Sequence, residues 1–113
     1  YKNFSKKIYN QKNNFLNFLS KNKNKSIYGY GAAAKTSTVL NFFKIKHSKF
    51  HVIDDNKLKQ GNYIPGTNIK IISKEHVNEK IDYLIIFAWN YFSEIKKKVK
   101  IAKEIISIRK FLN

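Results

Sequence analysis

Apolar runs alternate with polar, helix-compatible stretches along most of the chain, and five of these runs have the length of strands. They cover residues 26–30, 50–54, 69–72, 83–87 and 105–112. The run at 83–87 is continuously apolar, as is typical of a central parallel strand that is covered on both faces. We therefore expect it to pair beside the strand at 26–30.

Helices are predicted where apolar residues recur at three- and four-residue spacing. The apolar positions are Val39, Leu40 and Phe43 in residues 32–44, and Phe92, Ile95, Val99 and Ala102 in residues 91–103. The Lys-rich segment 1–24 has near-helical spacing at Phe4, Ile8, Phe15, Leu16 and Leu19. This segment is predicted to be an amphipathic connector helix, followed by a solvated link at 21–25. Residues 75–79 fit a single helical turn.

Strands that alternate with helices predict an α/β fold, a Rossmann-like three-layer sandwich with a mostly parallel five-stranded sheet. Right-handed crossovers favour the strand order 3-2-1-4-5. We expect residues 1–25 to be a connector helix and linker, and residues 26–113 to be the domain. The chain contains no Met, which suggests a piece of a longer protein.

The net charge of +16 comes almost entirely from Lys, with Arg109 as the one arginine. Lys is abundant throughout the chain together with Asn and Ile, whereas a nucleic-acid surface favours Arg, which contacts phosphate and guanine at two points. We predict no specific nucleic-acid partner, although a basic nucleic-acid-binding module stays an alternative. The lack of Cys excludes disulfides and thiolate chemistry. No apolar run approaches the length of about 20 residues that spans a bilayer, so a cytoplasmic protein without a membrane partner is expected.

The first strand runs into a glycine-rich turn that fits the dinucleotide-type pattern G-x-G-x-x-A, at Gly29, Gly31 and Ala34. In that pattern Gly29 permits the turn, Gly31 lets the backbone approach a phosphate, and Ala34 allows close packing of helix on strand. The helix start then offers unpaired amide groups to an anion, and Lys35 adds a positive charge beside them. A plain glycine-rich turn is the alternative.

Asp54 and Asp55 end the second strand, about 20 residues after the turn, where an acidic side chain can hold ribose hydroxyls. The irregular stretches 28–35, 54–67 and 88–90 should meet at the carboxyl edge of the sheet, where ligands of such sheets bind. A loop as long as the one at 56–68 is usually functional or disordered. The convergence of these stretches is the main argument from the residues for a binding site.

Several candidate residues have alternative interpretations. Lys35 and Thr36 nearly complete a phosphate-loop pattern, but Ala34 replaces its last glycine, which argues against a phosphate-loop NTPase. Trp89 can stack on a base or pack in the core, and Asn90 is expected to cap the following helix. His47, His51 and His76 lack metal-ligand spacing and are interpreted as structural or surface residues. Asp54 and Asp55 suit hydroxyl acceptance better than catalysis.

Four segments carry a more specific signal together. They are Gly29-Tyr30-Gly31-Ala32-Ala33-Ala34-Lys35, Val52-Ile53-Asp54-Asp55-Asn56, Lys59-Gln60-Gly61-Asn62-Tyr63-Ile64-Pro65-Gly66-Thr67 and Phe87-Ala88-Trp89-Asn90. In this order they resemble the C-terminal domain of sugar C-methyltransferases, over residues 27 to about 95. One departure is Thr36, where the family more often has glycine.

The resemblance implies a three-part enzyme that transfers a methyl group from S-adenosylmethionine to a carbon of a nucleotide-linked keto-deoxysugar. The zinc-binding N-terminal domain and the central methyltransferase domain would lie outside this chain and supply the acid-base residues for an enolate-like intermediate. The present domain would enclose the nucleotide-sugar, and alone it is expected to have no methyltransferase activity. Substrate contacts are predicted at Gly29, Tyr30, Gly31, Ala32, Ala33, Lys35, Asp54, Asp55, Lys59, Gln60, Gly61, Pro65, Gly66, Trp89 and Asn90. The alternative enzymes are a NAD-binding oxidoreductase domain and a nucleotide-sugar dehydratase domain.

Overall fold

A computed structural model describes residues 2–45, 50–77 and 79–112 of the chain. The helices are α1 (Lys2–Lys21), α2 (Ala34–Phe42) and α3 (Phe92–Lys98). The strands are β1 (Ile27–Tyr30), β2 (His51–Ile53), β3 (Ile71–Ile72), β4 (Ile81–Ile86) and β5 (Ala102–Ser107). Short 3₁₀ helices complete the fold: η1 (Lys74–His76), η2 (Trp89–Tyr91) and η3 (Ile108–Phe111).

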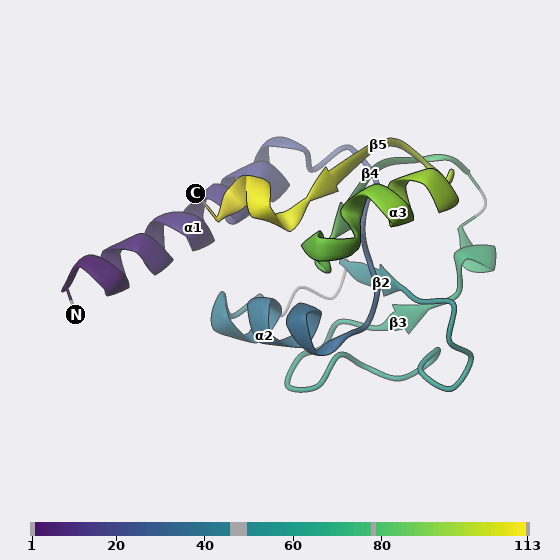
Figure 1. Cartoon of the computed structure of the whole chain (residues 1–113), viewed down its shortest axis with the longest axis horizontal. Coiled ribbons are helices and arrows are strands. Elements are labelled where there is room, and N and C mark those ends of the chain that lie inside the picture. The colour runs from purple at the N-terminus through teal and green to yellow at the C-terminus, as the bar shows by residue number, and fades with distance from the viewer. Residues whose placement is uncertain (1, 46–49, 78, 113) are drawn as a thin grey trace.

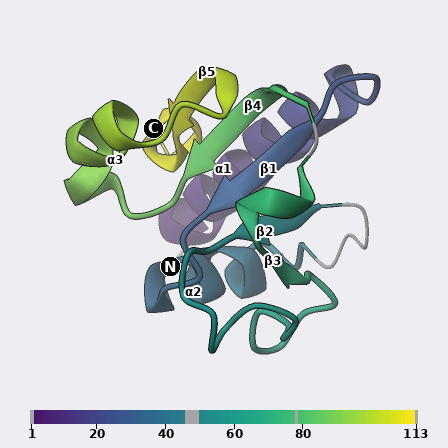
Figure 2. The same cartoon turned by 90° about the vertical axis from the view of Figure 1, so that its right-hand side faces the viewer.

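The strands form one five-stranded sheet in the order β3-β2-β1-β4-β5, and every pair is parallel. In the register of the central strand, Tyr28 of β1 lies opposite His51 of β2 on one side and Leu84 of β4 on the other. Figure 2 shows β1 and β4 side by side in the middle of this sheet. The predicted α/β class and strand order are confirmed.

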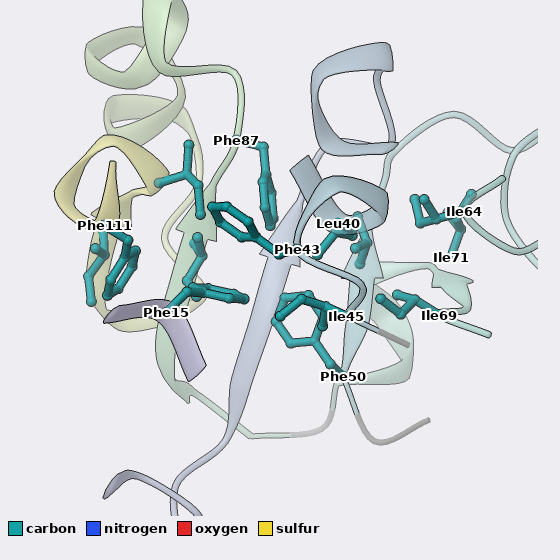
Figure 3. Close-up of a cluster of buried hydrophobic side chains, with 14 residues drawn as sticks. Phe15, Leu40, Phe43, Ile45, Phe50, Ile64, Ile69, Ile71, Phe87 and Phe111 are labelled. Atoms are coloured by element: carbon teal, nitrogen blue, oxygen red, sulfur yellow. The ribbon is translucent and has the colours of Figure 1, made fainter. Parts of the chain in front are cut away.

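One face of the sheet carries the larger core, which α1, α2 and η3 cover (Figure 1). Phe15 of α1 is fully buried, and its ring lies 5.3 Å from Phe111, 6.3 Å from Phe43 and 6.3 Å from Phe50 between centroids. Figure 3 shows these rings with Phe87 and the isoleucines that complete the cluster. The buried aromatic area fixes both helices on the sheet.

The other face carries a smaller core under α3. Ile53, Leu84 and Val99 are buried there, and Ile95 of α3 packs against them. Because apolar side chains of the central strands leave the sheet on both faces, the continuous apolar run in β4 is explained by burial on both sides. The three-layer arrangement follows from these two cores.

The stripe predicted for α1 is partly wrong. Phe15 is buried, but Leu16 is 37% exposed, and Phe18, which was not in the predicted stripe, contacts Tyr83 with its ring centroid 5.1 Å away. Among the described side chains of α1, those that meet the larger core are Phe15, Phe18 and Leu19, in the second half of the helix. Figure 1 shows the first half of α1 extending beyond the sheet.

The predicted helix at 91–103 is too long, and the predicted fifth strand starts too late. The α-helix ends at Lys98, and Val99 is already extended. Ala102 belongs to β5, where it lies opposite Ile81, and the chain leaves the sheet after Ser107, whose hydroxyl accepts from the amide of Arg109 at the start of η3. Pairing with β4 therefore prevails over the helical spacing of Val99 and Ala102.

Candidate functional site

The sheet order creates a switch point between β1 and β4, because the chain proceeds outward in opposite directions from these two central strands. Ligands of open parallel sheets bind beyond the carboxyl ends of the strands at such a point. The irregular segments that follow β1, β2 and β4 all begin at this edge. They are the segments in which the sequence places most of the candidate residues.

The turn itself is made by Gly31 and not by Gly29, which corrects the sequence interpretation. Gly29 lies buried in β1, where a Cβ atom would come within 2.9 Å of the Phe87 ring and 3.1 Å of Val52. Gly31 has φ +90°, a conformation that favours glycine, and open space lies where its Cβ would be. Gly29 therefore permits close packing within the sheet, and Gly31 permits the turn.

Helix α2 starts two residues after the predicted position, with Ala33 as the extended residue before it. Ala34 is exposed, so the prediction that it packs closely on the strand is wrong. Thr36 is the buried residue of this turn, 1% exposed, and its hydroxyl donates to the carbonyl oxygen of Gly31 at 2.5 Å. The threonine that departs from the family pattern thus ties the helix to the turn through its side chain.

Asp54 and Lys59 hold the residue that follows this turn. The Asp54 carboxylate accepts from the amide of Ala32 at 2.7 Å through Oδ2 and from the amide of Asn56 at 2.7 Å through Oδ1. The ammonium of Lys59 donates to the carbonyl oxygen of Ala32 at 2.9 Å. Both side chains are directed at backbone groups of the protein.

Asp55 points to another partner, Tyr30 at the end of β1. The phenol donates to Oδ2 of Asp55 at 2.8 Å. Burial of the ring raises the pKa of Tyr30 well above its usual range, and the hydrogen bond to Asp55 and the negative charges of Asp55 and Asp54 raise it further. Tyr30 is therefore a protonated donor at neutral pH, and the exposed Asp55 keeps acceptor capacity for other groups.

Lys35 connects the two sides of the switch point. From the first turn of α2 its ammonium reaches the segment after β4, donates to Oδ1 of Asn90, and lies 4.4 Å from the centroid of the Trp89 ring. Trp89 is partly buried and packs against the larger core. The expected cap role of Asn90 is wrong, because α3 is preceded by Tyr91 and no side chain caps it.

The loop after Asp55 is ordered by hydrogen bonds to the body of the domain. Gln60 donates through Nε2 to the carbonyl oxygen of Asp54 at 2.7 Å, and the amide of Gly61, at φ +88°, donates to Ile71 at 2.8 Å. Further on, the carbonyl oxygen of Pro65 accepts from Asn41 Nδ2 at 2.7 Å. Because Asn41 is six residues beyond Lys35, about 9 Å along the helix, the Pro-Gly part of the loop lies on the flank of α2.

The structure thus brings most predicted residues into one connected group. Its members are Tyr30, Gly31, Ala32, Ala33, Lys35, Asp54, Asp55, Lys59, Gln60, Gly61, Trp89 and Asn90. Gly29 lies behind the group in the sheet, and Pro65 and Gly66 lie beside α2, where Gly66 leaves room for the side chain of Asn41. Thr36 was missed as a member of the turn, although a threonine at the start of a helix is a known source of local side-chain hydrogen bonds.

Neither of the two described histidines belongs to this group. His51 has a buried Nδ1 without a hydrogen-bond partner among the described residues, and burial, followed by the charge of Lys70, lowers its pKa. His76 is exposed in η1, and His47 lies outside the described residues. In the described parts of the chain no cluster of acidic or histidine side chains could hold a metal ion.

A cavity of about 840 Å³ lies at the opposite, amino-terminal edge of the sheet, between the end of α1, the end of α2 and the start of β1. Leu16 and Phe50 contribute apolar surface to it, and Lys23, Lys25 and Lys44 contribute positive charge. None of the predicted site residues lines it. We assign the candidate site to the carboxyl edge because the switch point, the helix start and the polar contacts converge there.

Comparisons with known proteins support the resemblance to C-methyltransferases. A sequence family described as "C-methyltransferase C-terminal domain" matches residues 1–107. The chain is also 38% identical over 73 residues to C-methyltransferase NovU of Streptomyces niveus, an alignment that covers 63% of this chain and 17% of that protein. No helix among the described residues is long and apolar enough to cross a membrane. The chain belongs to the family of C-methyltransferase C-terminal domains.

Proposed function

We propose that this domain binds the nucleotide-sugar substrate of an S-adenosylmethionine-dependent C-methyltransferase that acts on a keto-deoxysugar nucleotide. The family supports the reaction class, and the contacts at the carboxyl edge support the role in binding. The main support for the proposal is the position of Lys35. Its half-buried side chain reaches from α2, on one side of the switch point, to Trp89 and Asn90 on the other.

A nucleoside diphosphate sugar carries its negative charge on the diphosphate, so a binding site needs donors and positive charge at one place. Lys35 supplies the charge. The first amides of a helix have no intrahelical partner, and no hydrogen bond between described residues uses the amides of Ala33, Ala34 or Lys35. These amides and the macrodipole of α2 add donors that favour an anion beside the ammonium of Lys35.

The remaining members of the group have complementary roles in this proposal. Asp55 is exposed and accepts hydroxyl hydrogens of the ribose or the sugar, with Tyr30 fixing its orientation. Trp89 holds the ammonium of Lys35 over one face of its ring, so its main role is to position that charge and not to stack on a base. Gln60 and Gly61 shape the loop beside the acidic pair.

The methyl transfer would take place between this domain and the parts of the enzyme that bind S-adenosylmethionine and carry the acid-base residues. The chain spans only 17% of the length of the relative, which leaves room for them. Holding a substrate in reactive geometry lowers the barrier by several kcal/mol, on the order of 7–11 in favourable cases. A domain without catalytic residues can therefore control the rate.

The acidic strand end does not by itself separate a nucleotide-sugar site from the NAD-binding alternative. In dinucleotide-binding sheets the acidic residue at this position accepts ribose hydroxyls. Here both carboxylate oxygens of Asp54 accept backbone amides of Ala32 and Asn56, which leaves the exposed Asp55 as the acceptor for a ribose of either ligand. A nucleic-acid-binding module is disfavoured because Lys35 is engaged in directed contacts with Trp89 and Asn90.

Trp89 provides a direct test, because it is the one tryptophan of the chain. Titration of the chain with UDP-glucose as a probe, in 150 mM salt, should give a saturable change in Trp89 emission when the diphosphate draws Lys35 from the ring. Lys35→Gln should weaken this binding about tenfold, the usual cost of a lost charge-assisted hydrogen bond. Lys57→Gln, which removes the same charge from an exposed position, is the matched control and should change affinity less than twofold, as about 0–1 kcal/mol is typical of exposed charges.

Three results would contradict the proposal. They are no saturable change in emission, equal effects of the two lysine substitutions, and tighter binding of NAD than of UDP-glucose in the same titration. The last result would favour the oxidoreductase alternative, since NAD shares the diphosphate but adds a second nucleoside.

A further inference from the structure

Side chains hold two planar peptide units of the glycine turn, the first at its carbonyl and its amide and the second at its carbonyl alone. In the unit between Gly31 and Ala32, the carbonyl accepts from the Thr36 hydroxyl and the amide donates to Asp54. In the unit between Ala32 and Ala33, the carbonyl accepts from Lys59 at 2.9 Å. A trans peptide directs its N–H and C=O to opposite sides, so the contact with Lys59 aims the amide of Ala33 away from the loop.

The amide of Ala33 is the backbone donor immediately before α2. It belongs to the exposed Ala33, the residue before the helix, and no hydrogen bond between described residues uses it. Lys35, whose ammonium is held by Trp89 and Asn90, follows two residues later. The positive charge of Lys59 on the carbonyl oxygen also polarises the same peptide unit and strengthens its N–H as a donor.

We infer that Asp54 and Lys59 are positioning residues that orient the peptide units of Gly31–Ala33 toward a bound diphosphate, without contacting the ligand themselves; this rests on the proposed function. Asp54 has both oxygens occupied by the amides of Ala32 and Asn56. Gln60 secures the same corner by donating to the backbone carbonyl of Asp54. Asp54 thus affects anion binding indirectly, by orienting the backbone amides of the turn.

The direction in which Asp54→Asn changes diphosphate affinity distinguishes a positioning role from a simple effect of charge. Asp54→Asn and Asp55→Asn each remove one negative charge from adjacent positions, and loss of a negative charge near an anion site should tighten anion binding. If Asp54 positions the turn, Asp54→Asn should instead weaken the binding of inorganic diphosphate about tenfold, because an amide has one acceptor oxygen, so the N–H groups of Ala32 and Asn56 no longer both have their partner. Asp55→Asn should tighten it.

The lysines of the loop give a second matched pair. Lys59→Gln should weaken diphosphate binding about tenfold, whereas Lys57→Gln should change it less than twofold. Lys59→Arg keeps a charged donor for the Ala32 carbonyl, so its binding should be weakened less than that of Lys59→Gln. Lys59 is only half-buried at the surface, so these variants should fold even if Asp54→Asn does not. Circular dichroism and thermal unfolding check the fold of each variant.

Amide spectra of the 113-residue chain in 150 mM salt provide the readout. In the wild type, inorganic diphosphate should shift the Ala33 resonance, and this shift should be lost in Lys59→Gln and retained in Lys57→Gln. If diphosphate does not bind the wild type at this turn, the proposed function fails and this inference fails with it. If diphosphate binds the wild type but Asp54→Asn binds it as tightly or more tightly, or if Lys59→Gln behaves as Lys57→Gln does, only the positioning role is overturned.

Discussion

The apolar layer under α1 and α2 differs from the carboxyl edge in the kind of contact that holds it. In the layer, Phe15 meets the rings of Phe43, Phe50 and Phe111 at centroid distances of 5.3 to 6.3 Å. At the edge, single polar contacts such as those of Lys35 with Asn90 and Tyr30 with Asp55 join elements that are distant in sequence. Each polar contact contributes about 1 kcal/mol, so a ligand can replace it, whereas the apolar layer has no such alternative partner. Stability and binding therefore depend on different regions.

The largest expected effect tests the apolar layer. Phe15→Ala should lower the free energy of unfolding by about 3–5 kcal/mol, because the fully buried ring leaves a cavity between α1, α2 and η3. Leu16→Ala, the matched control, removes a side chain that is 37% exposed and should cost well under half as much. Urea unfolding measures both. Similar losses for the two variants would contradict the importance given to the layer.

The two glycines of the turn motif sharpen the comparison, since one belongs to each region. Gly29→Ala should destabilise the domain by about 1–3 kcal/mol through overpacking against Phe87. Gly31→Ala meets no neighbour but places a Cβ at φ +90°, which costs about 1–2 kcal/mol of backbone strain. We expect the two variants to differ in their affinity for diphosphate.

Diphosphate titration of the two folded glycine variants measures that difference. Gly31→Ala should weaken binding, because it changes the path of the turn, while Gly29→Ala should leave the amides of the turn in place. The separation of packing from binding would not hold if Gly29→Ala weakened diphosphate binding as much as Gly31→Ala.

The sheet could be predicted from the sequence because its signal is local. The apolar runs that became β1, β2 and β4 are bounded by polar or glycine residues, and parallel pairing follows from the crossover rule. The segment from Val99 to Ala102 could not be predicted in the same way. Its apolar residues fit both a helical stripe and a strand, and only the pairing of Ala102 with Ile81 decides between them.

The site could be predicted as a group but not in its internal contacts. The topology alone brings Lys35, Asp54 and Trp89 to one edge. Which partner each side chain selects depends on distances of a few ångströms that spacing in sequence does not set. The sequence therefore predicts ribose hydroxyls as the partners of Asp54, whereas its carboxylate accepts two backbone amides, and it predicts at Gly29 the turn that Gly31 makes.

The smallest expected effect lies at the amino-terminal edge, where Asp82 resembles the polar contacts of the site but has no proposed ligand. Its carboxylate accepts from the amide of Ser26 at 2.9 Å and faces Lys103 at 3.3 Å, and these contacts, the Ser26 amide first, hold the pKa of Asp82 below its usual range. Because the pKa is lower in the folded state, the stabilisation is complete above the unfolded pKa of about 4 and is lost as the pH falls through the folded pKa.

Thermal unfolding of the wild type and Asp82→Asn from about pH 6 down to pH 2 measures this contribution. The wild type should be slightly more stable at pH 6, since an exposed ion pair contributes little, and the difference should vanish at the acid end. Glu104→Gln, an exposed carboxylate on the neighbouring β5, controls for the change in net charge. A difference that stayed constant with pH would mean that Asp82 supports the start of β1 through its shape and not through its charge. The contacts of Asp82 at the amino-terminal edge would then not depend on charge, unlike the contacts proposed for Lys35 at the carboxyl edge.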